Sequence, residues 1–157
     1  MFSIDHKRQE GEDNMNNQRL KHSFLCEALE DIKTFQDVLT NSWSKYYGHL
    51  LIKIIGSDTI PFFLITTEGT MLTLSDAATQ IETKYFRIEE IEKQSQTITV
   101  SLLRAFDLED KETNILKDVV RLEKSTAKAI VNLRYITAVQ LLEPDLLVRK
   151  FYVESKW

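Results

Sequence analysis

The sequence has few of the residues on which disulfide-stapled, zinc-bound and glycine-rich proteins depend. It contains one cysteine, four glycines and two prolines among 157 residues. A single cysteine excludes an intramolecular disulfide and a zinc site built from several cysteines. The small numbers of glycine and proline exclude collagen-like and low-complexity chains.

Basic charge in excess and long apolar runs are also missing. The 20 Lys and Arg residues are outnumbered by 24 Asp and Glu, and the net charge is −4. We therefore expect neither a nucleic-acid partner nor docking on an anionic membrane. The longest apolar runs, near 60–65 and 138–142, are far shorter than the about 20 residues that a membrane-spanning helix needs. The N-terminus lacks the apolar core of a signal peptide, so we expect synthesis in the cytoplasm without such a signal.

The composition that remains is typical of a single globular domain. Hydrophobic residues make up 43% and charged residues 28% of the chain, which allows a sizeable core. Residues 1–19 are polar and predict a mobile arm. The globular domain then covers 20–157, with a helix at 22–43, a β region at 49–142 and a C-terminal tail at 143–157.

The helix is predicted from apolar residues that recur at steps of three and four, while charged residues occupy the other face. This stripe suits docking either on a sheet or on a copy of the same helix. We therefore name it as a candidate self-association face, formed by Leu25, Leu29, Ile32, Phe35 and Leu39.

Short β-branched and apolar stretches separated by turn signals predict the strands. In 96–102 the alternation is regular: Ile98, Val100 and Leu102 are expected to face inward, and Thr97, Thr99 and Ser101 outward. Glu68 and Gly69 predict a hairpin turn between 60–67 and 71–74. The pattern indicates a mostly β fold with one N-terminal α-helix, a small antiparallel β-sandwich or barrel of about seven to eight strands. The predicted strands are 49–55, 60–67, 71–74, 84–91, 96–102, 119–123, 128–133 and 135–142.

The usual catalytic, phosphate-binding and metal-binding motifs are absent from the sequence. His22 and Cys26 are four residues apart, but a metal would need two further ligands. A histidine could also activate Cys26 as a nucleophile, but we interpret Cys26 as a small hydrophobe near the start of the helix. The acidic residues at 89–92 and 107–112 lack the spacing of a calcium loop and are interpreted as solvated surface. We therefore predict no catalytic, cofactor-binding or metal-binding residues.

Residues 58–66 read D-T-I-P-F-F-L-I-T, and the runs F-R-I-E, L-L-R-A-F-D and R-L-E-K follow later in the chain. These stretches resemble, in the same order, the segments D-T-[VI]-P-F-x-[IL]-[FY]-T, F-R-[VI]-E, L-L-x-A-F-D and R-L-E-K of the CotY/CotZ/ExsY family of spore-coat and exosporium proteins of endospore-forming bacteria. The likeness covers roughly 28–148. Its parts are 28–32 with 36–37, 58–66, 85–89, 102–107, 120–124, 129–133 and 138–142.

The resemblance implies a structural protein and not an enzyme. Such a protein is made in the mother cell, is deposited on the spore surface, and binds itself or related coat proteins to build an outer layer, with no cofactor and no small-molecule substrate. The family is rich in cysteine, yet its late cysteines would fall near Lys128, Tyr135, Thr137 and Gln140 of this chain. Cys26 lies near the family's early cysteine and is the candidate for an intermolecular disulfide, so a lattice would depend mainly on noncovalent contacts.

Two other interpretations stay open at this point. One is a small non-enzymatic β-barrel binding module that recognises a peptide, a glycan or a protein partner. The other is a hydrolase, which would need two acidic residues that converge in one cleft.

Overall fold

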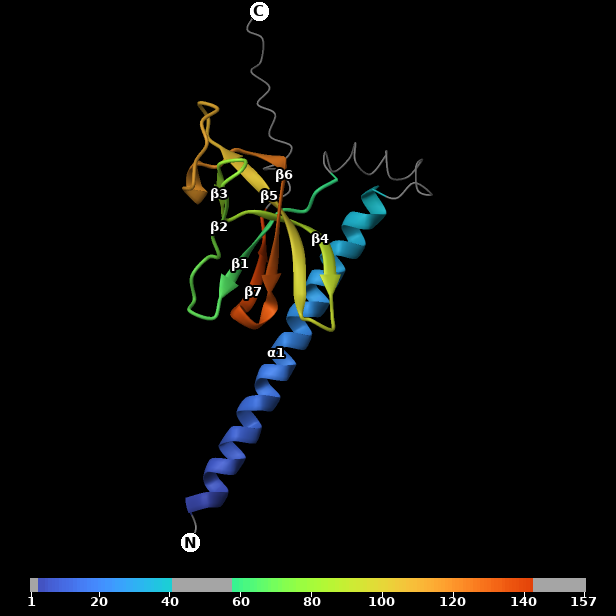
Figure 1. Ribbon diagram of the computed structural model, residues 1–157, viewed down its shortest axis with the longest axis vertical. Helices are drawn as coiled ribbons and strands as arrows, with labels where there is room; N and C mark the ends of the chain where they lie inside the picture. Colours follow the sequence, from blue (N-terminus) through green and yellow to red (C-terminus); the bar gives the residue numbers. More distant parts are fainter. Residues whose placement is uncertain (1–2, 41–57, 143–157) are drawn as a thin grey trace, which may run out of the picture.

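The computed structural model describes residues 3–40 and 58–142, which form one long helix followed by antiparallel strands (Figure 1). The prediction of a mostly β protein with one N-terminal α-helix is therefore confirmed. The elements are α1 (Ser3–Thr40), β1 (Phe62–Thr66), β2 (Leu74–Asp76), β3 (Ile81–Thr83), β4 (Phe86–Glu92), β5 (Thr97–Phe106), the 3₁₀ turn η2 (Leu116–Asp118), β6 (Arg121–Asn132), the 3₁₀ turn η3 (Leu133–Tyr135) and β7 (Ile136–Leu141).

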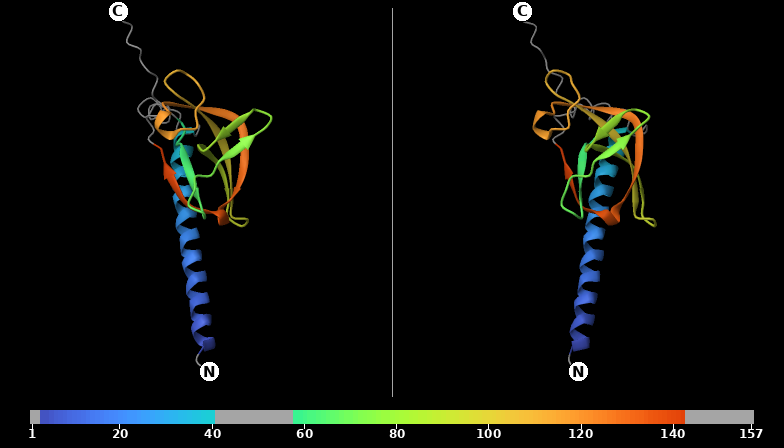
Figure 2. Two further views of the ribbon diagram at one scale, coloured as in Figure 1. Left: turned by 90° about the vertical axis from the view of Figure 1, so that its left-hand side faces the viewer. Right: turned by 60° about the vertical axis from the view of Figure 1, so that its left-hand side comes forward.

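The strands form a five-stranded antiparallel sheet in the order β6-β5-β4-β1-β7 and a separate hairpin of β2 and β3. Among the described strands, β6 and β7 lie at opposite ends of this order, so the sheet is not closed into a barrel. β1 and β4 are paired only where Phe62 lies opposite Phe86. The helix α1 packs against β4 and β7, the strands on either side of β1 (Figure 2).

The main core lies between α1 and one face of the sheet. Phe62 and Phe86 are fully buried there, with ring centroids 6.3 Å apart. The inward-facing residues predicted for β5, which are Ile98, Val100 and Leu102, are all buried in this core, as expected. A second buried cluster includes Phe63 and Tyr85, the sequence neighbours of the two phenylalanines, and successive side chains of a strand point to opposite faces.

A buried glutamine fixes α1 on the sheet. Gln36 is 2% exposed; its Nε2 donates a hydrogen bond to the Ile88 carbonyl at 2.7 Å, and its Oε1 accepts one from the Ile60 amide at 3.4 Å. The pairing of β4 with β5 shifts register between Ile88 and Glu90. The side-chain amide of Gln36 thus donates to a backbone carbonyl of β4 at the point where the pairing of β4 with β5 is irregular.

The helix is longer than the sequence predicts, because α1 begins at Ser3 and includes most of the segment 1–19 that we expected to be an arm without regular structure. The side chains described in this part, at 14–17 and 19–20, are exposed. Hence the extension needs no core of its own. Once the packed turns from Leu25 onward have nucleated the helix, a proline-free stretch can continue it. Residues 41–43 of the predicted helix, the predicted strand 49–55 and the tail 143–157 lie outside the described residues.

Three details of the predicted strands are wrong. The predicted strands 119–123 and 128–133 form one strand, β6, because a register shift opposite Ser101–Leu103 absorbs the polar residues between them. Segment 71–74 does not form a full strand beside β1: Met71 makes an isolated bridge to Ile65 and the Leu72 amide donates to the Leu64 carbonyl at 2.8 Å. Leu74 instead begins β2, which pairs with β3, a strand too short to be predicted. Ser101, expected to be exposed, is buried. The turn itself is present, with Gly69 at a positive φ of 82°.

Candidate functional site

Most of the predicted self-association face is used inside the molecule. Leu25, Leu29, Ile32 and Leu39 are buried, and the first three pack in the core with the strands of the large sheet. Of the two alternatives that the stripe allowed, the helix therefore docks on its own sheet. Phe35 is the exception, because 48% of its surface is exposed.

A second row of residues lies on the exposed side of α1. Leu20, Phe24, Glu27, Asp31 and Phe35 follow one another at steps of four, three, four and four residues, so they share one side of the helix. We call this row the outer seam. All five residues are exposed, and Phe24 shows 67% of its surface.

The N-terminal part of α1 extends away from the strands (Figures 1 and 2). A helix of 38 residues is about 57 Å long. On this part Met15 is 59% exposed and Leu20 is 56% exposed. Leu20 is continuous with Phe24 along the outer seam, so the apolar end of the seam reaches the part of α1 that extends beyond the strands. The sequence interpretation missed Leu20 and Phe24 because they lie off the buried stripe, although their spacing to Glu27 and Asp31 was visible.

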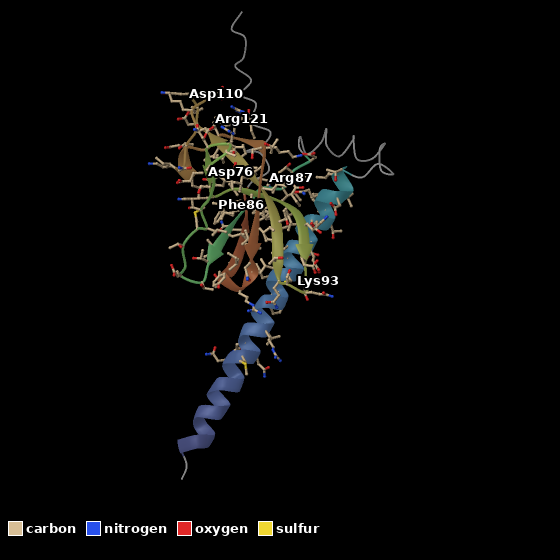
Figure 3. The ribbon with its side chains drawn as sticks, viewed as in Figure 1. Asp76, Phe86, Arg87, Lys93, Asp110 and Arg121 are labelled. Atoms are coloured by element: carbon tan, nitrogen blue, oxygen red, sulfur yellow. The ribbon has the colours of Figure 1, made fainter. Side chains whose placement is uncertain are left out.

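Cys26 is half-buried beside the main core and has no disulfide partner in the structure. Burial, and to a lesser extent the Glu30 carboxylate, raises the pKa of the thiol, whereas the Lys93 ammonium lowers it. Lys93 lies at the turn after β4, where its Nζ is 2.5 Å from Oε1 of Glu30 on α1 (Figure 3). Because the thiolate is the reactive form, a raised pKa slows disulfide formation at neutral pH. The intermolecular disulfide of Cys26 stays a prediction.

Arg87 on β4 is the centre of a buried polar network (Figure 3). Its Nε donates to Thr59 Oγ1 at 3.2 Å and its Nη1 to Glu89 Oε1 at 2.6 Å, while Ser101 Oγ donates to the same carboxylate oxygen at 2.6 Å. Burial would raise the pKa of Glu89, but these two hydrogen bonds and the charges of Arg87 and Lys128 lower it below its ordinary value. The carboxylate is held ionised by its partners, so the network suits a structural role.

The two outer strands of the sheet differ in how open they are to strand addition. The outer strand β6 carries exposed Lys124 and Lys128 and an irregularity where Ser125 Oγ donates to the Leu102 carbonyl at 2.6 Å. Lysines and bulges of this kind hinder the addition of another strand. The other outer strand, β7, has no charged residue, but α1 packs against it.

The charged loop after β5 is tied down by Arg121. The guanidinium of Arg121 lies 4.2 Å from the Phe106 ring centroid and pairs with Asp110 at 2.5 Å and with Glu123 (Figure 3). Asp110 belongs to the acidic segment 107–112 that was interpreted as solvated surface, and it is exposed. Glu89 of the other acidic segment is not solvated surface, because Arg87 and Ser101 hold it in the buried network. Within the described residues, no group of three or more His, Cys, Asp or Glu side chains is placed to hold a metal ion.

No helix in the described part of the chain has both the length and the apolar character to cross a membrane. Comparison with protein-family models, with curated proteins and with solved structures finds no match for this chain.

Proposed function

We propose that this protein is a non-enzymatic structural component of the outer layer of a bacterial spore, where it binds itself or related coat proteins without disulfide cross-links. The observation that carries the proposal is the long helix α1, which anchors its C-terminal part on the sheet and exposes apolar side chains beyond it. A helix held in this way is suited to contact a neighbouring molecule.

The resemblance to the CotY/CotZ/ExsY proteins supplies the spore layer in this proposal. Apart from the helical stretches 28–32 and 36–37, the segments that carry the likeness lie mainly in β1, β4, β5, β6 and β7. The resemblance therefore concerns mainly the strands of the large sheet. The missing late cysteines concern only whether neighbouring molecules are linked by disulfides. Interfaces that form without covalent links depend on concentration and contact area.

The test is the assembly state of the purified protein, alone and mixed with a cysteine-rich protein of the CotY/CotZ/ExsY family. Light scattering and negative-stain microscopy, each with and without reductant, report the particles that form. Sheets, rings or large particles that persist in reductant would support noncovalent assembly. Assembly that is lost in reductant would make Cys26 the essential contact and contradict the proposed noncovalent contacts.

A single small species under every condition, with no co-assembly, would refute the proposal. It would favour the alternative function, a small β binding module that recognises a peptide, a glycan or a protein without building layers.

A further inference from the structure

The outer seam of α1 has a definite order of chemistry along its length. Leu20 and Phe24 form one apolar end, Phe35 forms the other, and the carboxylates of Glu27 and Asp31 lie between them. The five residues extend over about 22 Å of helix. The seam is therefore an apolar ridge with an acidic centre.

The acidic centre of the outer seam takes part in none of the ion pairs formed among the described residues. Glu30 pairs with Lys93, and Asp37 pairs with Lys33 at 2.7 Å. No ion pair joins Glu27 or Asp31 to another residue in the described part of the chain. Lys33 and Lys93 are thus paired with acidic residues outside the outer seam, and within the described residues the seam keeps two negative charges that no ion pair neutralises.

We propose that the outer seam is a docking surface for an amphipathic helix of a partner protein, whose apolar residues flank a basic centre. The steps of four, three and four from Leu20 to Asp31 match the heptad repeat by which two helices pack along a shared line, and Phe35 lies one turn further on the same side. Lysine or arginine at the centre of the partner would meet the two carboxylates, and apolar side chains would cover both ends. Along its length, the partner helix would therefore present apolar, then basic, then apolar side chains to the outer seam.

A second copy of α1 fits this surface poorly. In a parallel pair each seam residue meets its own counterpart, so Glu27 faces Glu27 and Asp31 faces Asp31. An antiparallel pair that sets Phe24 against Phe35 brings all four carboxylates together at its centre. Because opposed like charges disfavour a complex, the seam selects against itself and in favour of a basic partner.

This inference rests on the proposed function only in that it names the chemistry of a coat partner, and it can be tested without any layer. The probe is a synthetic helical peptide of about 18 residues, long enough to be helical. It has leucines at both ends of one side, two lysines between them and two glutamates on the opposite side, so that its net charge is zero. In the control peptide the lysines and glutamates exchange places, which leaves the composition unchanged.

Binding is measured by fluorescence anisotropy with the full chain. We expect the lysine-seam peptide to bind at least about 10-fold more tightly than the control peptide, because two attractive charge pairs replace two repulsive ones. The variant Glu27→Lys/Asp31→Lys should reverse this preference. A reversal of preference cannot arise from misfolding, which would abolish both interactions.

The matched control variant is Glu68→Lys/Glu82→Lys, which makes the same change of charge at two exposed positions away from α1. It should bind like the wild type. If both variants lose the preference equally, net charge and not the seam decides the binding, and the inference is wrong. Absence of saturable binding up to about 1 mM would also overturn it.

Sedimentation of the unmodified chain tests the second copy as occupant. A dimer that Phe24→Lys converts to a monomer would assign the seam to self-pairing and overturn the inference. Peptide binding without layers would refute only the proposed function, whereas layers without peptide binding would refute only this inference.

Discussion

Replacing Gln36 by leucine tests whether a single buried amide holds α1 on the sheet. The substitution Gln36→Leu keeps a side chain of similar size but removes the donor to the Ile88 carbonyl and the acceptor for the Ile60 amide. An unsatisfied buried acceptor costs about 1–3 kcal/mol. The bond from Ile60 is long at 3.4 Å and adds little, so the expected loss of unfolding free energy is about 2 kcal/mol.

Urea unfolding followed by circular dichroism measures this loss. With a slope of about 2 kcal/mol/M for a chain of this size, the midpoint should fall by about 1 M. The exposed neighbour Thr34 supplies the control, since Thr34→Leu on the same helix should change stability by no more than about 0.5 kcal/mol. Equal midpoints for Gln36→Leu and Thr34→Leu would refute the argument.

A second substitution at the same position gives a signature that packing alone cannot produce. In Gln36→Glu, a carboxylate would face the Ile88 carbonyl oxygen, so its pKa should rise in the folded state. Relative to the wild type, the stability of Gln36→Glu should then be greatest at low pH, where the protonated carboxyl can still donate, and this relative stability should be lost as the pH rises above about 4.3. A stability profile parallel to that of the wild type would contradict the geometry.

Three further predictions concern the core, the polar network and the thiol. Phe86→Ala should lower the unfolding free energy in urea by about 3–5 kcal/mol, whereas Phe35→Ala at its exposed site should lower it by no more than about 0.5 kcal/mol; equal losses would contradict the core assignment. Glu89 has a lowered pKa, so its contribution is present above about pH 4.3 and is lost as the pH falls through the folded value. Glu89→Gln should therefore be less stable than the wild type at neutral pH in thermal melts, and the two should converge in acid; a constant difference would refute the sign. Glu30→Gln should lower the pKa of Cys26 and speed its alkylation by iodoacetamide at neutral pH, because Glu30 raises that pKa; an unchanged rate would argue against this coupling.

The spacing of apolar residues in the sequence predicted the elements in which buried residues recur at regular intervals. Ile98, Val100 and Leu102 alternate with polar residues along β5 and are buried as expected. The buried stripe of α1 was likewise visible in its steps of three and four. Ser101 broke the rule because Glu89 and Arg87 of the neighbouring strand provide partners that a single strand cannot reveal.

The length of α1 and the continuity of β6 were not predictable for a different reason. Both depend on structure that forms elsewhere in the chain. The packed C-terminal turns of α1 nucleate the exposed turns that precede them. Pairing with β5 keeps the two halves of β6 in one strand across the bulge at Ser125. Composition indicates only whether a segment has enough apolar residues to form a core by itself. Residues 3–19 do not have enough, and they are helical because they continue a helix whose later turns pack on the sheet.

The outer seam was present in the sequence but could not be distinguished from a solvated helix face. Glu27 and Asp31 belonged to the charged side of the helix, and Phe35 was assigned to the buried stripe. Only the placement of Leu25 and Leu29 against the sheet identifies which side of α1 remains open. The outer seam could be identified as a candidate docking surface only after the buried apolar stripe of α1 was seen to pack on the sheet.

Because β1 pairs with β7, the large sheet can finish folding only after the last described strand has been made. Phe62 near the start of the described β region lies opposite Leu141 near its end, and contacts between distant residues form slowly. On a ribosome, α1 is made first, yet β7, one of the two strands it packs against, is made last. The buried stripe of α1 therefore lacks part of its cover until β7 has been made, and encounters between nascent chains at that stage compete with folding. The late addition of β7 to the sheet thus makes the concentration of nascent chains, and not only the final fold, a determinant of how much correctly folded protein forms.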